Sequence, residues 1–92
     1  MQLSYDPAKN LRNESERGIS FEAVAQLDWS SALIQSDERK DYGEPRFRVL
    51  GFIEGRLHAL VFTPRAGRVH VISLRKANPR EIKHHAQATH SG

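Results

Sequence analysis

The sequence predicts a single α+β domain, in which two N-terminal helices precede an antiparallel sheet of three to four strands and a C-terminal helix ends the fold. Three observations lead to this prediction. The 92 residues suit one domain. The N-terminal part carries helix start and stop signals, whereas residues 46–74 are runs rich in Val, Ile, Leu and Phe between turn residues. With 38% hydrophobic and 27% charged residues, the composition is that of a chain with a small core.

Two helix signals lie in the N-terminal part. Asp6 is a typical N-cap residue, Pro7 suits the first helical position and Gly18 is a stop signal, which together predict a helix over residues 7–17. A serine at the next boundary can cap a second helix over residues 21–27, whose apolar side chains form a helical stripe. This second stripe is expected to pack in the core.

The sheet is predicted from apolar runs that turn residues separate. The expected strands are residues 32–34, 46–53, 56–63 and 68–74, with a charged loop over 37–45. Asn78 before a proline, with Glu81 three residues later, predicts a capped last helix from residue 79 to about 88. We treat residues 1–92 as one domain and expect residues from about 89 to 92 to fray.

The turn lengths predict a register for the two hairpins. Phe62 should lie opposite Phe47 in the first hairpin and opposite His70 in the second. One face then collects the bulkier apolar side chains and is expected to lie under the helices. The other face should be basic and partly open, and its members are Arg46, Arg48, Leu50, Phe52, Leu57, Ala59, Val61, Thr63, Val69, Val71, Ser73 and Arg75. A one-residue slip would exchange the two faces.

Charge is distributed unevenly between the two halves of the chain. Residues 1–45 carry five Lys/Arg and nine Asp/Glu, whereas residues 46–92 carry nine Lys/Arg, two Asp/Glu and all five histidines, and the net charge is +3. Clustered cations bind a polyanion by releasing its counterions, so the second half suits nucleic acid or another phosphate-bearing partner. The alternative is a solvated basic surface.

Several classes of protein lack their sequence signatures here. There is no long apolar stretch and no charged-then-apolar leader, so we expect a cytoplasmic protein with no membrane contact. The absence of cysteine excludes disulfides, Cys-based zinc sites, iron–sulfur clusters and a thiol nucleophile. No P-loop, GxGxxG, HExxH or GxSxG motif is present. His84 and His85 would point about 100° apart on a helix, so we expect no metal and no other cofactor.

The remaining chemistry is that of arginine, lysine and histidine, a set that can cleave RNA without a metal ion. The reaction needs a base near the ribose 2′-hydroxyl, a cation on the phosphate oxygens and a proton donor for the leaving 5′-oxygen. The candidates are Arg46, Arg48 and Arg75 for the phosphate, His58, Glu81 and His85 for proton transfer, and Tyr42 for proton donation or base stacking. For each of them, an ordinary surface or structural role is the alternative.

Four ordered segments carry a resemblance over nearly the whole chain. They are Tyr5-Asp6-x-x-Lys9-Asn10-x-x-Asn13, Arg17-Gly18-Ile19-Ser20-Phe21-Glu22-Ala23, Asp41-Tyr42-Gly43-Glu44-x-Arg46-Phe47, and Ile72-Ser73-x-Arg75-Lys76-Ala77 followed by Arg80-Glu81. Together they resemble the BrnT family. The resemblance implies a fold similar to RelE-type ribonuclease toxins, and a type II toxin that cuts RNA and arrests growth. It also implies a BrnA-like antitoxin that neutralises the toxin and through which the pair reaches its operator DNA.

The resemblance transfers to individual residues unevenly. The family's residue types stand at Lys9, Asn13, Arg46, Arg75, Arg80 and Glu81. Two positions depart from the family pattern. Glu16-Arg17 replaces the common Lys-His before the glycine, which removes a candidate general base, and His85 stands where a tyrosine is common. A weakened or inactive toxin is therefore an alternative.

The leading hypothesis is a metal-independent endoribonuclease toxin whose antitoxin covers the arginine-bearing face. The expected catalytic residues are Arg46, His58, Arg75, Arg80 and His85, and the expected RNA-binding residues are Lys9, Arg17, Tyr42, Arg48 and Lys76. One alternative is a catalytically weak homologue that acts mainly as a partner-binding co-repressor module. Another is a nonspecific nucleic-acid binder, which the shortage of aromatic residues free for stacking disfavours.

Overall fold

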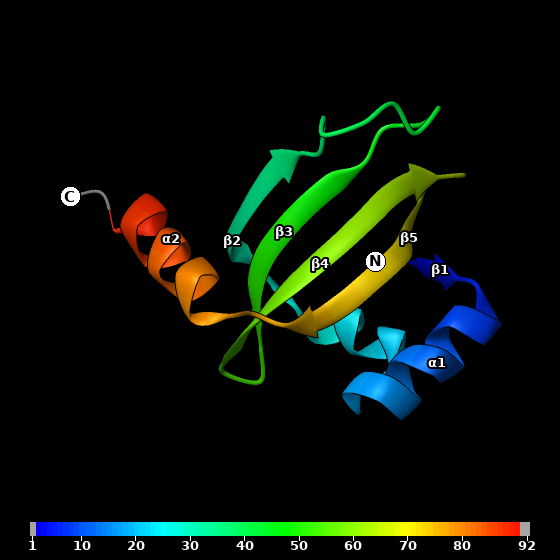
Figure 1. Cartoon of the computed structure of the whole chain (residues 1–92), viewed down its shortest axis with the longest axis horizontal. Coiled ribbons are helices and arrows are strands. Elements are labelled where there is room, and N and C mark those ends of the chain that lie inside the picture. The colour runs from blue at the N-terminus through cyan, green and yellow to red at the C-terminus, as the bar shows by residue number, and fades with distance from the viewer. Residues whose placement is uncertain (1, 91–92) are drawn as a thin grey trace.

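The computed structural model describes residues 2–90 and is built around one five-stranded sheet (Figure 1). The elements in chain order are β1 (Leu3–Tyr5), α1 (Pro7–Arg17), the 3-10 helix η1 (Phe21–Gln26), β2 (Asp28–Ser36), β3 (Phe47–Ile53), β4 (Arg56–Arg65), β5 (Arg68–Lys76) and α2 (Pro79–Thr89). The strand order is β1-β5-β4-β3-β2. In the described part of the chain, no helix has the length and apolarity that a membrane crossing requires.

The prediction of two N-terminal α-helices is wrong, because the second segment is a short 3-10 helix. Ser20 caps it as expected and accepts a hydrogen bond from the backbone N–H of Glu22 at 3.1 Å. A 3-10 helix has three residues per turn, so Phe21, Val24 and Leu27 fall in one row. Their exposed fractions are 1%, 0% and 6%. A six-residue segment gains little from α-helical hydrogen bonds, and burial of this row decides its conformation.

The prediction of an antiparallel sheet of three to four strands is also wrong. The sheet has five strands and is mixed, because β1 pairs in parallel with β5, with Leu3 opposite Val69 and Tyr5 opposite Val71. A three-residue strand is too short to show an alternating pattern. Its parallel partner lies at the other end of the chain, so only the tertiary fold brings the two segments together.

Other sequence predictions are confirmed. Helix α1 has the predicted bounds, with the Asp6 carboxylate accepting from the backbone of Ala8 and Gly18 in the left-handed region at φ 69°. Helix α2 begins at Pro79 with the expected capping box. It ends at Thr89, and the tail that we expected to fray lies partly outside the described residues. The first hairpin has the predicted register, with Phe47 opposite Phe62.

The core lies between the η1 row and one face of the sheet. Phe21 and Val24 pack against Val49, Leu60 and Leu74, each of which is at most 1% exposed. Leucine 27 approaches the backbone of β3 so closely that a Cβ on the glycine at position 51 would lie 2.9 Å from one of its methyl carbons. The contact of this short helix with the sheet therefore fixes the covered face.

The second hairpin departs from the predicted register. Its turn contains only Ala66 and Gly67, both at positive φ, so residues 64 and 65 stay in β4. The register then shifts between Val61 and Phe62, and Ile72 is an extra residue in β5 with no partner in β4. Phe62 consequently lies opposite Val71 rather than His70.

Because of this β-bulge, the predicted faces of β5 are wrong before Ile72. Val71 is 1% exposed and belongs to the core, and Val69 packs against the core, although both were expected on the open face. Beyond the bulge the alternation resumes with Leu74 in the core. Ser73 and Arg75 lie on the open face as predicted.

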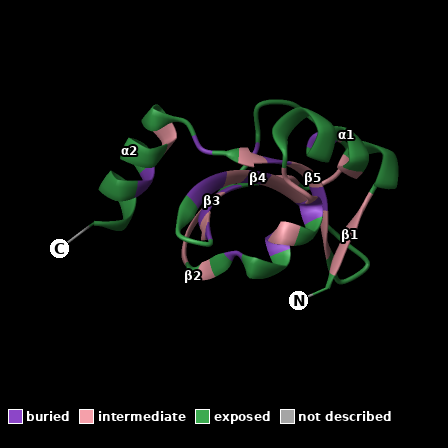
Figure 2. Ribbon diagram, turned by 90° about the horizontal axis from the view of Figure 1, so that it is seen from below, coloured by how far each residue is buried: buried purple, intermediate pink, exposed green. Residues whose placement is uncertain are grey.

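The three helical segments take different places around the sheet (Figure 2). Only η1 covers the core face, whereas α1 contacts β5 near one edge and α2 contacts β2 at the other. Figure 2 shows α1 and α2 beside opposite edges of the curved sheet. The face opposite η1 is thus bordered by two helices but not covered by either.

Truncation of the largest buried side chain tests the role of the η1 row. We expect Phe21→Ala to lower the free energy of unfolding by about 3–5 kcal/mol, because the surrounding core cannot collapse fully into the cavity. The matched control is Leu11→Ala, since Leu11 is 68% exposed on α1 and its loss should cost less than about 0.5 kcal/mol. Urea denaturation measures both, and equal effects would contradict this account of the core.

Candidate functional site

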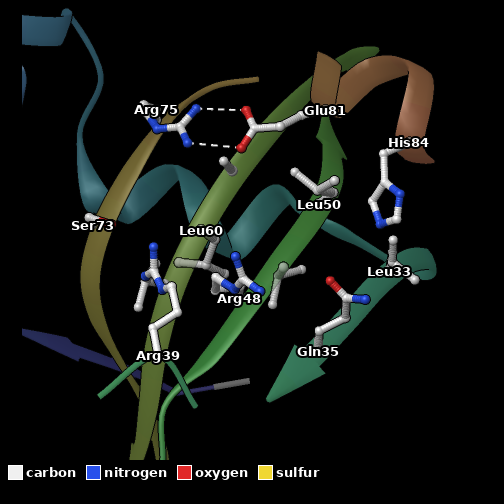
Figure 3. A pocket seen from close by; sticks show the side chains of 13 residues that line it. Leu33, Gln35, Arg39, Arg48, Leu50, Leu60, Ser73, Arg75, Glu81 and His84 are labelled. Atoms are coloured by element: carbon white, nitrogen blue, oxygen red, sulfur yellow. Dashed lines mark hydrogen bonds and ion pairs between the residues drawn. The ribbon is translucent and has the colours of Figure 1, made fainter. Parts of the chain in front are cut away.

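The open face of the sheet contains a hollow of about 380 Å³. Its floor is formed by side chains of the three central strands, among them Leu50, Ala59 and Ser73. Figure 3 shows side chains from β2, from the loop after it and from α2 around this floor. The lining that carries chemistry consists of Gln35, Arg39, Arg48, Ser73, Arg75, Glu81 and His84.

A bidentate ion pair joins the end of β5 to the start of α2. The Arg75 guanidinium donates from Nη1 to Glu81 Oε1 at 2.8 Å and from Nη2 to Oε2 at 2.9 Å (Figure 3). The same carboxylate accepts from the backbone N–H of Asn78 at 2.9 Å and completes the capping box. Donation by Arg75 holds the pKa of Glu81 below its usual value, and the pair raises the pKa of Arg75. Glu81 therefore caps α2 and fixes Arg75 at once.

A second ion pair lies at the other end of the hollow from Arg75 and Glu81. Arg39 donates from Nε and Nη2 to the two carboxylate oxygens of Asp37, each at 2.7 Å. These bonds place the pKa of Asp37 well below its usual range, and Arg48 contributes to the same shift through its charge. The Asp37 side chain is 1% exposed, whereas that of Arg39 is 61% exposed. The buried carboxylate thus anchors a guanidinium that faces solvent.

Arg48 lies between these two pairs on β3. Within residues 2–90 its side chain makes no hydrogen bond and no ion pair, and the residue is exposed. Its charge lowers the pKa of both Asp37 and Glu81. Figure 3 shows its guanidinium in the hollow. The site therefore holds three guanidinium groups against two carboxylates, and one guanidinium keeps its full capacity for an anion.

His84 brings an imidazole to the hollow from α2. It is exposed, and it follows Glu81 by three residues, so both side chains lie on the same face of the helix (Figure 3). From the sequence, His84 was a candidate only for metal binding, and Arg39 and Gln35 were not expected at the site. The spacing from Glu81 was the signal that could have identified His84.

The structure brings two of the predicted site residues, Arg48 and Arg75, together in the hollow. Arg46 and Tyr42 lie in a neighbouring depression, where the Arg46 guanidinium stacks on the Tyr42 ring with 4.1 Å to the ring centroid. Arg46 also lies 3.6 Å from the carboxylate of Glu44. This cation is thus already engaged beside the hollow rather than inside it.

The other predicted catalytic residues lie away from the hollow. His58 is 4% exposed beside η1, and its Nδ1 lies 2.7 Å from the backbone carbonyl of Arg56. His85 is 5% exposed, with Nε2 2.9 Å from the carbonyl of Ser31, and holds α2 to β2. Arg80 is exposed on α2 outside the hollow's lining.

The remaining predicted RNA-binding residues divide between two places. Lys76 lines the depression next to His58 and is exposed there. Lys9 and Arg17 line a depression between α1 and β5, together with the Ser73 that also lines the hollow. Both of these α1 residues are exposed.

Comparison with known proteins identifies the family of the chain. A protein-family model described as "Ribonuclease toxin, BrnT, of type II toxin-antitoxin system" matches residues 5–81. The chain belongs to the BrnT family. A search of curated proteins found no match to the chain.

The family match confirms the BrnT family that the four sequence segments indicated. A BrnT-family protein is a ribonuclease toxin, and its type II system includes an antitoxin protein as a partner. The match extends from β1 to the first turn of α2, so Arg48, Arg75 and Glu81 lie inside it. His84 lies just beyond it.

Acid should weaken the attachment of α2 in this BrnT-family protein. The ordinary pKa of a glutamate is 4.5, and pairing with Arg75 lowers that of Glu81 in the folded chain only. As the pH falls, the unfolded chain therefore binds this proton first, and the stabilisation is lost as the pH approaches the lowered value. We expect the urea-unfolding free energy to fall as the pH drops below about 4.5, less steeply in Glu81→Gln. Glu38→Gln, which removes an exposed loop carboxylate, is the control, and identical slopes in both variants would contradict the pairing.

Proposed function

We propose that this toxin is a metal-independent endoribonuclease that cleaves RNA in the hollow and thereby arrests growth in the cytoplasm. The observation that carries the proposal is the unpaired guanidinium of Arg48 between two guanidiniums that carboxylates hold in place. Such a cluster stabilises the negative charge that develops on phosphate oxygens during cleavage. The ribonuclease family supports an RNA substrate.

The groups in the hollow support a cleavage step that needs no metal ion. The ribose 2′-oxygen attacks the phosphorus as a base removes its proton, the bond from phosphorus to the 5′-oxygen breaks, and an acid protonates that oxygen. The products are a 2′,3′-cyclic phosphate and a 5′-hydroxyl. In our proposal Arg48 binds the phosphate oxygens, Arg75 adds its charge beside Glu81, and His84 transfers a proton.

The two histidines expected from the sequence do not transfer protons in this proposal. His58 and His85 each use a ring nitrogen on a backbone carbonyl and are almost fully buried. A proton-transfer group needs access to the substrate, which the exposed His84 has. We therefore assign proton transfer to His84, and the orientation of α2 to His85.

The partner is proposed to inhibit by covering the hollow. A BrnA-like antitoxin with an acidic segment would place carboxylates against the open guanidinium, which favours rapid association. Operator DNA would then be bound through the antitoxin rather than through this chain.

Removal of the open guanidinium tests the proposed site. We expect Arg48→Ala to slow RNA cleavage by about 10²–10³-fold, since an electrostatic contact to the reacting phosphate is lost. The matched control is Arg68→Ala, an exposed arginine at the start of β5 and outside the hollow's lining, which should keep the wild-type rate. Induction of each soluble chain without an antitoxin, followed by growth and total RNA integrity, provides the measurement.

Two outcomes of this experiment would contradict the proposal. Equal cleavage rates of Arg48→Ala and the wild-type chain would show that the reaction takes place outside the hollow. Intact RNA and normal growth with the soluble wild-type chain would instead favour a partner-binding module without catalytic activity. This second function is supported by the pairing of Arg75, because Nη1 and Nη2 of its guanidinium already donate to Glu81.

Substitutions of the adjacent residues His84 and His85 distinguish a catalytic role from a structural one. We expect His84→Gln to reduce the cleavage rate and to remove one limb of its pH profile, because a proton-transfer group is lost. His85→Gln should instead lower the melting temperature and keep the shape of the pH profile, since His85 is buried against β2. The opposite pattern would assign proton transfer to His85.

A further inference from the structure

A row of cations on α1 faces the edge of β5 beside the hollow. Lys9, Arg12 and Arg17 line a depression there together with Ser73 and the bulge residue Ile72. Lys9 and Arg12 are three residues apart and so are neighbours on the helix surface, and Arg17 lines the same depression from the last turn of α1. All three cations are exposed, and Glu16 is the one carboxylate-bearing residue among the lining residues.

The fold fixes the position of this row. Asn13 is 7% exposed in the middle of it, and its side-chain amide donates to the carbonyls of Leu74 at 3.0 Å and of Ile19 at 2.9 Å. Arg17 donates in turn to the Asn13 side-chain oxygen at 3.3 Å. These bonds tie the cationic face of α1 to β5 and leave Lys9 and Arg12 free of ion pairs among the described residues.

The depression and the hollow share one lining residue. Ser73 lines both of them, because the bulge at Ile72 turns Ser73 to the open face while α1 lies beside the same residues of β5. Figure 2 shows α1 at this side of the sheet, across from α2. Cations therefore line both depressions that Ser73 borders, with Arg48 and Arg75 in the hollow and Lys9, Arg12 and Arg17 on α1.

We propose, on the basis of the ribonuclease function proposed above, that the α1 row binds the phosphates of single-stranded RNA next to the bond cleaved in the hollow. A strand whose scissile phosphate lies on Arg48 and that leaves past Ser73 meets the α1 cations with its following phosphates. The depression is lined by one aromatic residue, Phe21, which is 1% exposed and committed to the core. Recognition there rests on phosphate charge rather than on base stacking, so it is independent of base sequence.

The test measures binding to RNA that cannot be cleaved. The probe is a mixed-sequence 12-nucleotide RNA with 2′-O-methyl groups throughout, which removes the attacking hydroxyl and makes binding independent of catalysis. The variant is the double substitution Lys9→Gln, Arg12→Gln. The control is Arg56→Gln, Arg68→Gln, which removes the same charge from two exposed strand ends outside both depressions.

We expect the α1 double variant to weaken binding about tenfold or more at 0.1 M salt and to reduce the slope of log affinity against log salt by about 1.4, which corresponds to two phosphate contacts on a single strand. The control pair should stay within about twofold of the wild-type chain. Thermal unfolding of each variant establishes that all remain folded.

Three results would overturn this inference. One is wild-type RNA affinity in the α1 variant. Another is an equal loss of RNA affinity in the control pair, which would show that net charge alone explains the effect. The third is unchanged RNA binding together with weaker binding of the acidic antitoxin, which would assign the row to the protein partner. Cleavage of unmodified RNA is measured separately, so an inactive chain that still uses the α1 row would contradict the proposed function and leave this inference standing.

Discussion

The extra residue in β5 is the constraint on which the open face depends. In a regular strand, Val71, Ser73 and Arg75 would all point to the same side. Because Ile72 has no partner in β4, Val71 points into the core, whereas Ser73 and Arg75 point away from it. One bulge thus allows the strand to bury apolar side chains on both sides of the break and still present a guanidinium to the hollow.

Two polar attachments near the C-terminal end of this strand position the helices around the hollow. Asn13 ties α1 to the carbonyl of Leu74 in the second half of β5. Arg75, the next residue along, ties α2 to the sheet through Glu81. Neither helix contributes much apolar burial, since the buried residues of α1 and α2 are Asn13 and His85. Hydrogen bonds and charge therefore place these helices, while the apolar core is formed by η1 and the sheet.

The charges of the hollow come from both halves of the chain. Charge counting along the sequence points to a basic second half, and Arg48 and Arg75 do belong to it. Arg39 and its anchor Asp37 come from the acidic first half, as do the cations of α1. Each carboxylate near the site is paired with a guanidinium, so it orients a cation and at the same time neutralises it. The unpaired Arg48 remains as the group best able to accept an anion.

The sequence by itself determined the local features and the family. The caps at Asp6 and Asn78 and the turn before residue 56 are encoded within a few residues, and the four ordered segments identified a BrnT-family toxin. Tertiary contacts decided the rest. A bulge inside an apolar run leaves no pattern, a three-residue strand is recognisable only by its distant partner, and a short segment with apolar residues three apart becomes a 3-10 helix only against a sheet. The sequence therefore identified arginines and histidines as candidates, and packing decided which of them share the hollow.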